Sequence, residues 1–548
     1  MTKIEQLEGL GFKTAVRPIR YLFAAAAFLL FSVPSGDACT SIMVGKKASS
    51  DGSVMTAHCC DSYYRTYVTI EPRKSFAPGE TEPYYFNVLH KEEPWDPRGV
   101  YETGRIVPPA LQTYRFVNTA YPCMNERQLA IGETTFDGNK DLINRGGVFW
   151  IEELERLALE YCDNARDAIR LMGEMAERYG YADWGETLTV ADPNEVWQFE
   201  INGPGPGEPG AIWAAQRIPD DHVGISANIA RIGVVDFNDP DHFMYCKDLK
   251  KKAKALGLWD GKEPLKFWKV VGDPKRKPFS VREWFVFNTL APSLGLSLDD
   301  EELPFSVKPE VPVTPERMMA FYRETYEGTD LDMGKNLKIK AHRRIKNPDS
   351  DPYPYATYTE YDEEITPVSN WMSADVRAML NQIAPGTVTN RRTIAVIQCS
   401  YSWIAQCRDW LPDEVGGVLW FSFDNPGQSP RFPIYAGATK LPEEMGHCGQ
   451  NSYRPEAAVW AFRETNRIAT VYWDKTRKLL EPERALFERM MLEQDAALQE
   501  KVKALPAEGR EEAVATLLNA QTDSFFAMVA GKWRALKGRV LEIFVRSM

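Results

Sequence analysis

The alternation of apolar and polar positions divides the chain into strand-rich blocks and helical segments. Short apolar, β-prone runs separated by turn residues predict strands at 40–44, 53–57, 66–70 and 129–135. Apolar side chains at helical spacing over 151–178, with charges between them, predict a pair of amphipathic helices. Further strand-like runs lie at 187–191, 196–201, 212–216, 224–227, 393–399, 417–423 and 433–436.

The remaining segments differ in composition. Residues 240–390 are richer in Pro, Lys and Asp, with few clear periods, and we expect an insertion or a substrate-covering region there. From residue 455 onward the pattern is mostly helical. This order predicts an α+β fold. The helical tail is compatible with packing on the core or with a homo-oligomeric interface, and both alternatives stay open.

The N-terminus has the pattern of a secretory signal. Four basic residues precede an apolar run at 21–33, and a Pro34-Ser35-Gly36 break leads to Asp37-Ala38-Cys39. We expect cleavage before Cys39 and a secreted or periplasmic protein. The alternatives are a retained membrane anchor, a buried N-terminal helix, or a lipoprotein acylated on Cys39. Asp37 and Gly36 argue against the lipoprotein because they replace the apolar and small residues that such a site prefers.

Composition and net charge limit the classes of binding partner that this protein can have. The chain has 548 residues, 44% of them hydrophobic, which is typical of a globular protein with a large core. A formal net charge of -12 disfavours nucleic acid and anionic membrane surfaces as partners. We therefore expect membrane contact only through the transient signal segment. If Cys39 is a free nucleophile, eight of the nine cysteines remain for disulfides or for unpaired, buried positions.

A cysteine at a new N-terminus can be nucleophile and base in one residue. Its α-amino group, with an unperturbed pKa of about 7.7 to 8, can accept the thiol proton at neutral pH. The thiolate would attack a carbonyl, form an acyl-enzyme, and be released by water. Asp61 follows the second predicted strand, where a returning hairpin would bring it beside Cys39 to hold the amino group.

Metal sites are weaker interpretations of the remaining motifs. Cys59-Cys60 beside His58 resembles a ligand cluster, but adjacent strand residues point to opposite faces and no partner Cys-x-x-Cys exists. His222 and His242 lie among aspartates, which is more typical of a solvated acidic loop. We expect no metal and no cofactor.

Several runs of residues together resemble one known family. They are 39–49 (CTSIMVGKKAS), Asp51-Gly52-Ser53, Asp61-Ser62, Asn125-Glu126, 129–135, 189–197, 223–231 and 416–421. These runs resemble the cysteine dipeptidase family, which includes lactobacillar dipeptidase A and the secernins. That family belongs to the N-terminal-nucleophile hydrolases, together with penicillin V acylase and bile-salt hydrolase. The resemblance covers most of residues 39 to about 470.

The resemblance implies a four-layer αββα sandwich of antiparallel sheets with Cys39 as nucleophile. By position, Asp61 matches the aspartate that binds the nucleophile's amino group, and Asn228 matches an oxyanion-hole asparagine. Thr134 falls near the other oxyanion contributor, and Arg391 or Arg392 is a weaker match to an active-site arginine. One departure is His58, which stands where relatives often carry arginine and which we expect to titrate near neutrality.

The sequence thus predicts three segments: a signal peptide at 1–38, a hydrolase domain at 39–470 with an insertion around 240–390, and a helical C-terminal extension at 471–548. The expected function is a secreted dipeptidase acting on short peptides. An N-acyl amide hydrolase of the same fold and a catalytically silent surface-binding protein are the alternatives.

Overall fold

The computed structural model describes residues 39–86, 89, 101–106, 108, 110–207, 209–345 and 357–547. The chain divides into Met1–Asp37 and a compact unit, Ala38–Met548, and only the second unit contains described residues. The predicted signal segment therefore lies outside the described residues. Among the described helices, none has the length and apolar character that crossing a lipid bilayer requires.

The first of two large sheets contains the strand that follows Cys39. Within the described residues it has seven strands, paired antiparallel. In spatial order they are β14 (Ser306–Val307), β12 (Val223–Ser226), β1 (Thr40–Val44), β2 (Val54–Asp61), β17 (Cys399–Cys407), β18 (Val418–Phe423) and β19 (Phe432–Tyr435). The predicted strand at 393–399 is wrong, because the chain enters the sheet only at Cys399 and stays in it to Cys407.

The second sheet supplies the opposing face of the core. Within the described residues it has eight antiparallel strands. In spatial order they are β13 (Phe243–Tyr245), β11 (Ile212–Ile218), β10 (Val196–Asn202), β9 (Gly185–Ala191), β8 (Ala130–Asp137), β7 (Met124–Asn125), β6 (Phe116–Asn118) and β3 (Thr69–Glu71). The hairpins β4 (Glu82–Phe86) with β5 (Tyr101–Ile106) and β15 (Ile339–Ile345) with β16 (Thr357–Ile365) form separate two-stranded sheets.

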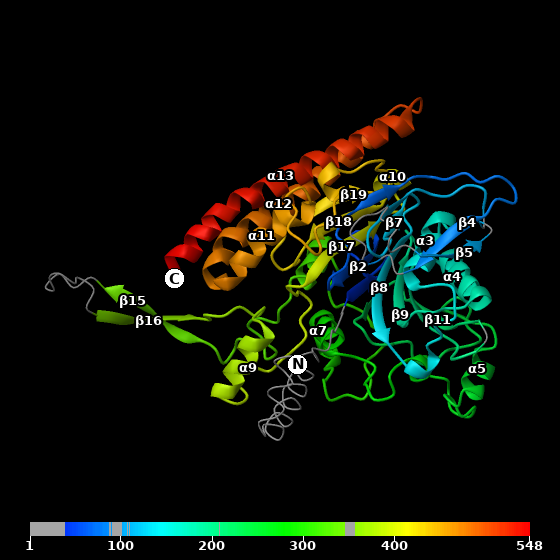
Figure 1. Cartoon of the computed structure of the whole chain (residues 1–548), viewed down its shortest axis with the longest axis horizontal. Helices are drawn as coiled ribbons and strands as arrows, with labels where there is room; N and C mark the ends of the chain where they lie inside the picture. The colour runs from blue at the N-terminus through cyan, green and yellow to red at the C-terminus, as the bar shows by residue number, and fades with distance from the viewer. Residues whose placement is uncertain are drawn as a thin grey trace, which may run out of the picture. The chain divides into compact units, whose positions relative to one another are not determined.

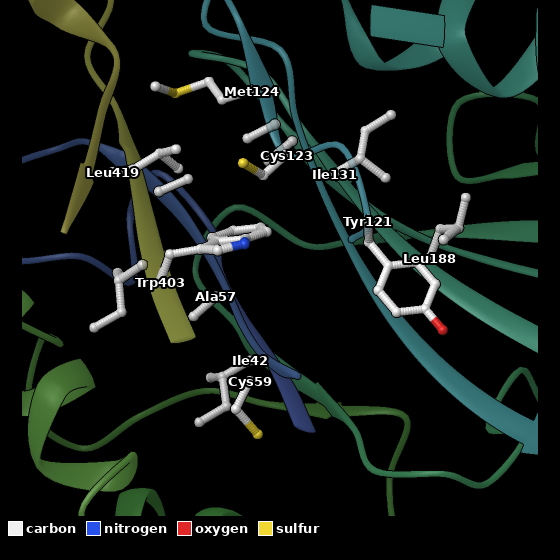
Figure 2. Close-up of a cluster of buried hydrophobic side chains, with 14 of the residues drawn as sticks. Ile42, Ala57, Cys59, Tyr121, Cys123, Met124, Ile131, Leu188, Trp403 and Leu419 are labelled. Carbon is white, nitrogen blue, oxygen red and sulfur yellow. The ribbon is translucent and has the colours of Figure 1, made fainter. Parts of the chain in front are cut away.

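The two large sheets meet at β1 and β2 on one side and β8 and β9 on the other. Thr56 of β2 and Thr189 of β9 are hydrogen bonded at 2.7 Å between their hydroxyl oxygens. Gly132 of β8 permits this approach, since a Cβ there would lie 2.8 Å from the Thr189 hydroxyl. Figure 2 shows the Trp403 indole directed from β17 toward the side chains of the second sheet. The core is therefore built largely between the sheets.

Helices cover both sheets. The predicted helix pair is confirmed as α3 (Ile151–Tyr161) and α4 (Ala165–Tyr179), and α4 packs on β9, β10 and β11. At the other end of the chain, α11 (Ala458–Val471), α12 (Trp473–Lys503) and α13 (Arg510–Ser547) lie side by side against β18 and β19 (Figure 1). A buried ion pair of 2.6 Å between Arg408 Nη1 and Asp495 Oδ2 ties α12 to the sheet. The helical tail therefore packs on the core.

The region around 240–390 contains short helices beside the strands β13 to β16. The helices are α5 (Leu249–Ala255), α6 (Phe267–Val271), α7 (Val281–Leu290), α8 (Pro315–Phe321) and α9 (Ala374–Ile383); α10 (Asp413–Gly416) follows β17. The described chain is thus a mixed α and β protein with antiparallel sheets and a helical C-terminal region, as predicted. All nine cysteines are free and buried, so the unpaired alternative holds in this structure.

Candidate active site

Cys39 lies directly before β1, at one end of the inter-sheet core. Cys39 is only 1% exposed to solvent. The antiparallel register pairs Thr40 with Cys59, which places Cys39 opposite Cys60. A hydrogen bond with the Cys60 thiol, burial and the charge of Glu133 raise the pKa of Cys39 well above its ordinary value. The thiol is therefore protonated at neutral pH and needs a base before it can attack.

The thiol lies close to the imidazole of His58, from β2 of its own sheet, and to the carboxylate of Glu133, from β8 of the second sheet. One ligand-type atom of each of Cys39, His58 and Glu133 lies within 4.8 Å of the others, and all three residues are buried. Ser41, two residues after Cys39, donates its hydroxyl to the Glu133 carbonyl at 3.1 Å. Thiolate, imidazole and carboxylate are the donors that a divalent metal such as zinc accepts, so these three are the described residues able to hold one. The same grouping is equally suited to moving a proton.

His58 does not titrate near neutrality, and that expectation is wrong. Burial lowers its pKa to about 4, against the opposing effects of the Glu133 carbonyl and the Asp61 charge. Its Nδ1 lies 2.8 Å from the Glu133 carbonyl oxygen, and its ring packs against Tyr121 and Trp403. A charged arginine is thus replaced by a neutral, buried imidazole.

His58 makes stability pH-dependent in a defined direction. Its pKa is about 4 in the folded chain and 6.5 when unperturbed, so the unfolded chain binds more protons between these values. The free energy of unfolding should therefore fall by up to about 3 kcal/mol, from this group alone, as the pH drops from 6.5 to 4. Urea denaturation across this range, for wild type and His58→Gln, measures the effect as a difference between their pH profiles. Parallel profiles would contradict it.

Asp61 occupies the opposite face of β2 from the thiol. Its Oδ2 accepts hydrogen bonds from Arg392 Nη2 at 2.6 Å and from the Cys59 thiol at 3.0 Å. Its buried Oδ1 accepts none from the described residues. Of the two candidate arginines, the structure brings Arg392 to Asp61, whereas the Arg391 backbone nitrogen contacts the Met333 sulfur at 3.4 Å.

Asn228 follows β12 in the left-handed backbone region, with φ of 62°, which asparagine tolerates better than most residues. Its Nδ2 donates to the Thr135 carbonyl at 2.6 Å, which leaves one N–H of the amide for another acceptor. Thr134 is buried, and its hydroxyl is engaged with the Ser226 hydroxyl at 2.5 Å. Asn228 is therefore the less constrained donor of the two.

Arg282 connects Cys39 to Asn228, and sequence reasoning missed it. Its Nη1 donates to the Cys39 carbonyl at 2.7 Å and its Nη2 donates to Asn228 Oδ1 at 2.8 Å. The residue lies in α7, which begins with a capping box formed by Ser280 and Glu283. That Ser-x-x-Glu spacing is a sequence signal for the helix start, but it does not reveal what the arginine contacts. Glu133 was also missed, inside a run assigned only as a strand.

Comparisons with known proteins identify the family of the chain. The model of peptidase family C69 matches residues 38–484. A probable dipeptidase of Latilactobacillus sakei is 25% identical over 434 residues, covering 74% of this chain and 77% of the relative. Dipeptidase A of Lactobacillus helveticus is 24% identical over 417 residues, covering 74% of this chain and 76% of the relative.

A probable dipeptidase of Salmonella dublin is 23% identical over 475 residues, covering 81% of this chain and 93% of the relative. These names and the family match confirm the cysteine dipeptidase family predicted from the residues around Cys39. The match extends over most of the chain. The chain belongs to peptidase family C69.

Proposed function

We propose that this protein is a secreted cysteine dipeptidase whose nucleophile is Cys39, exposed as the first residue when residues 1–38 are removed. The family match and the dipeptidase relatives support peptide hydrolysis as the general activity. The finer statement, Cys39 as nucleophile, rests on the position of this residue at the entry to β1 and opposite Cys60 of β2, one residue after the family match begins. Short peptides are the proposed substrates.

The chemistry follows from the raised pKa of the thiol. The free α-amino group of Cys39 accepts the thiol proton, and the thiolate attacks the peptide carbonyl. The same amino group then protonates the leaving amine, and water releases the acyl group. Asp61 holds this amino group through Oδ1, while Arg392 fixes its other oxygen. The antiparallel register supports this role because it sets Cys39 opposite Cys60, the neighbour of Asp61 in β2.

The tetrahedral intermediate needs donors for its oxygen. We assign the free N–H of Asn228 to that role, with Thr134 as a secondary candidate. Arg282 positions both partners, since one guanidinium binds the Cys39 carbonyl and Asn228 Oδ1. Arg391 and His58 have no assigned step: His58 stays neutral because of its low pKa and lines the thiol's surroundings.

The four-layer αββα arrangement of the fold is part of the same proposal. Helices α3 and α4 on the second sheet, and α11 to α13 on the first, support an αββα order of layers. The three-segment division at residues 38 and 470, the secreted or periplasmic location and the oligomeric state stay predictions.

The substrate class can be tested with purified chain that begins at Cys39. We expect kcat/KM for alanine- or arginine-containing dipeptides to exceed that for N-acyl amino acids by at least about 100-fold, about 2.7 kcal/mol in transition-state binding. Chromatography of the released free amino acids measures the turnover of both substrate classes. Activity confined to the N-acyl compounds would replace the dipeptidase with an acylase, and no turnover of either class would favour a silent binding protein.

A further inference from the structure

Buried carboxyl groups gather around Glu133, beside the Cys39 thiol, and no cation among the described residues forms a salt bridge with Glu133. Glu133 is 0% exposed; its Oε1 accepts the Thr135 hydroxyl at 2.9 Å, and its Oε2 accepts nothing from the described residues. Glu186 of β9 and Glu155 of α3 are also buried, and each has at least one carboxyl oxygen that accepts no hydrogen bond from the described residues. A buried charge without a partner is costly, so a site of this kind is suited to a cation supplied from outside.

The charges that surround these carboxyls are themselves mostly acidic. Burial raises the pKa of Glu133 to about 7, and burial followed by the Glu133 charge raises the pKa of Glu186 well above its ordinary value. Asp183 lies close enough to both to raise the pKa of each, and Arg145 is the cation whose charge acts on Asp183. Burial keeps much of this group protonated near neutral pH, and a cation placed beside Glu133 would favour its charged form.

The position of Glu133 fits one particular cation. In a dipeptide with a free amino end, the ammonium nitrogen is two bonds from the attacked carbonyl carbon, about 2.5 Å away. The carbonyl carbon must come within about 3–3.5 Å of the thiol sulfur. A carboxylate that binds this ammonium must therefore lie within a few ångströms of the thiol, and the Glu133 carboxylate lies within 4.8 Å of it. Asp61 is less suitable because it sits on the other face of β2 with Arg392.

We propose that the Glu133 carboxylate, backed by Glu186, binds the α-ammonium of the peptide substrate and so restricts the enzyme to peptides with a free amino end. This inference rests on the proposed function and names what recognises its substrate. Glu133 is then a substrate-binding residue, not a proton donor in the reaction.

The test compares a dipeptide with its desamino analogue, which keeps the peptide bond but lacks the amino group. Wild type should prefer the dipeptide, and Glu133→Gln should lower kcat/KM for the dipeptide by about 10- to 100-fold, mainly through KM. The ratio of kcat/KM for the dipeptide to that for the desamino analogue should fall by the same factor, whatever the loss of the Glu133 charge beside Cys39 does to the turnover of both. Glu153→Gln is a matched control, because Glu153 is buried on α3 but paired with Arg156 at 2.6 Å; its substrate preference should equal that of wild type.

Other outcomes separate the two proposals. If Glu133→Gln lowers turnover of both substrates equally, or leaves the preference intact, this inference is overturned while dipeptide hydrolysis by wild type stands. If wild type hydrolyses no dipeptide, the proposed function itself fails. Should Glu133→Gln not fold, wild type alone still decides: alanine amide should inhibit competitively at least about 10-fold better than its desamino analogue, propionamide. Equal inhibition would overturn the inference.

Discussion

Replacing Cys39 by serine should lower kcat/KM for a dipeptide by at least about 10³-fold while the fold is retained. Serine is close to cysteine in size, and Cys39 is buried, so the packing around β1 changes little. The hydroxyl is harder to ionise than a thiol whose pKa is already raised by Cys60, burial and Glu133. The α-amino base would then have too little driving force to generate the nucleophile.

The matched control is Cys246→Ser, at another buried cysteine, which contacts the backbone of Trp213. Its activity should remain within a factor of about two of wild type. Mass spectrometry after mixing with substrate should find an acyl adduct on wild type and none on the Cys39→Ala chain. A Cys39→Ser chain as active as wild type would exclude the thiol as nucleophile.

Retention of one residue before Cys39 should have an effect of similar size. A chain that begins at Ala38 carries an amide nitrogen in place of the free amine, and an amide nitrogen does not accept a proton near neutral pH. Loss of a positioned general base costs about 10²- to 10⁴-fold. We therefore expect this loss in kcat/KM when purified chains that start at Ala38 and at Cys39 are compared.

Intact mass establishes each N-terminus, and equal unfolding temperatures show that folding is not the cause. Equal activity would contradict the amine as base. The proton would then have to go to a side chain of the thiol's surroundings, and His58, within the 4.8 Å cluster, would be the first to examine. Its pKa of about 4 makes it a weak base at neutral pH, so its replacement would distinguish the two mechanisms.

The pattern of apolar and polar residues predicted the first strand pair and the helices α3 and α4. The strand pair after Cys39 follows from β-prone runs around a Ser-Asp-Gly turn, and α3 with α4 follows from helical spacing of apolar residues. The run at 393–399 was misassigned because an apolar, β-branched run satisfies the pattern of a strand whether or not a partner is available. Strand β2 pairs instead with Cys399–Cys407, and the loop before this strand carries Arg392 to Asp61.

The sequence by itself pointed to the family and singled out Cys39 and Asp61, because motif spacing within one hairpin survives in the linear order of residues; through the resemblance it added Asn228 and either Arg391 or Arg392. Only the tertiary structure decided which groups surround the thiol. Glu133 and Arg282 reach Cys39 from 94 and 243 positions away, through sheet packing and a helix in an irregular region. It also decided the state of His58, since burial between two sheets, and not residue type, sets its pKa.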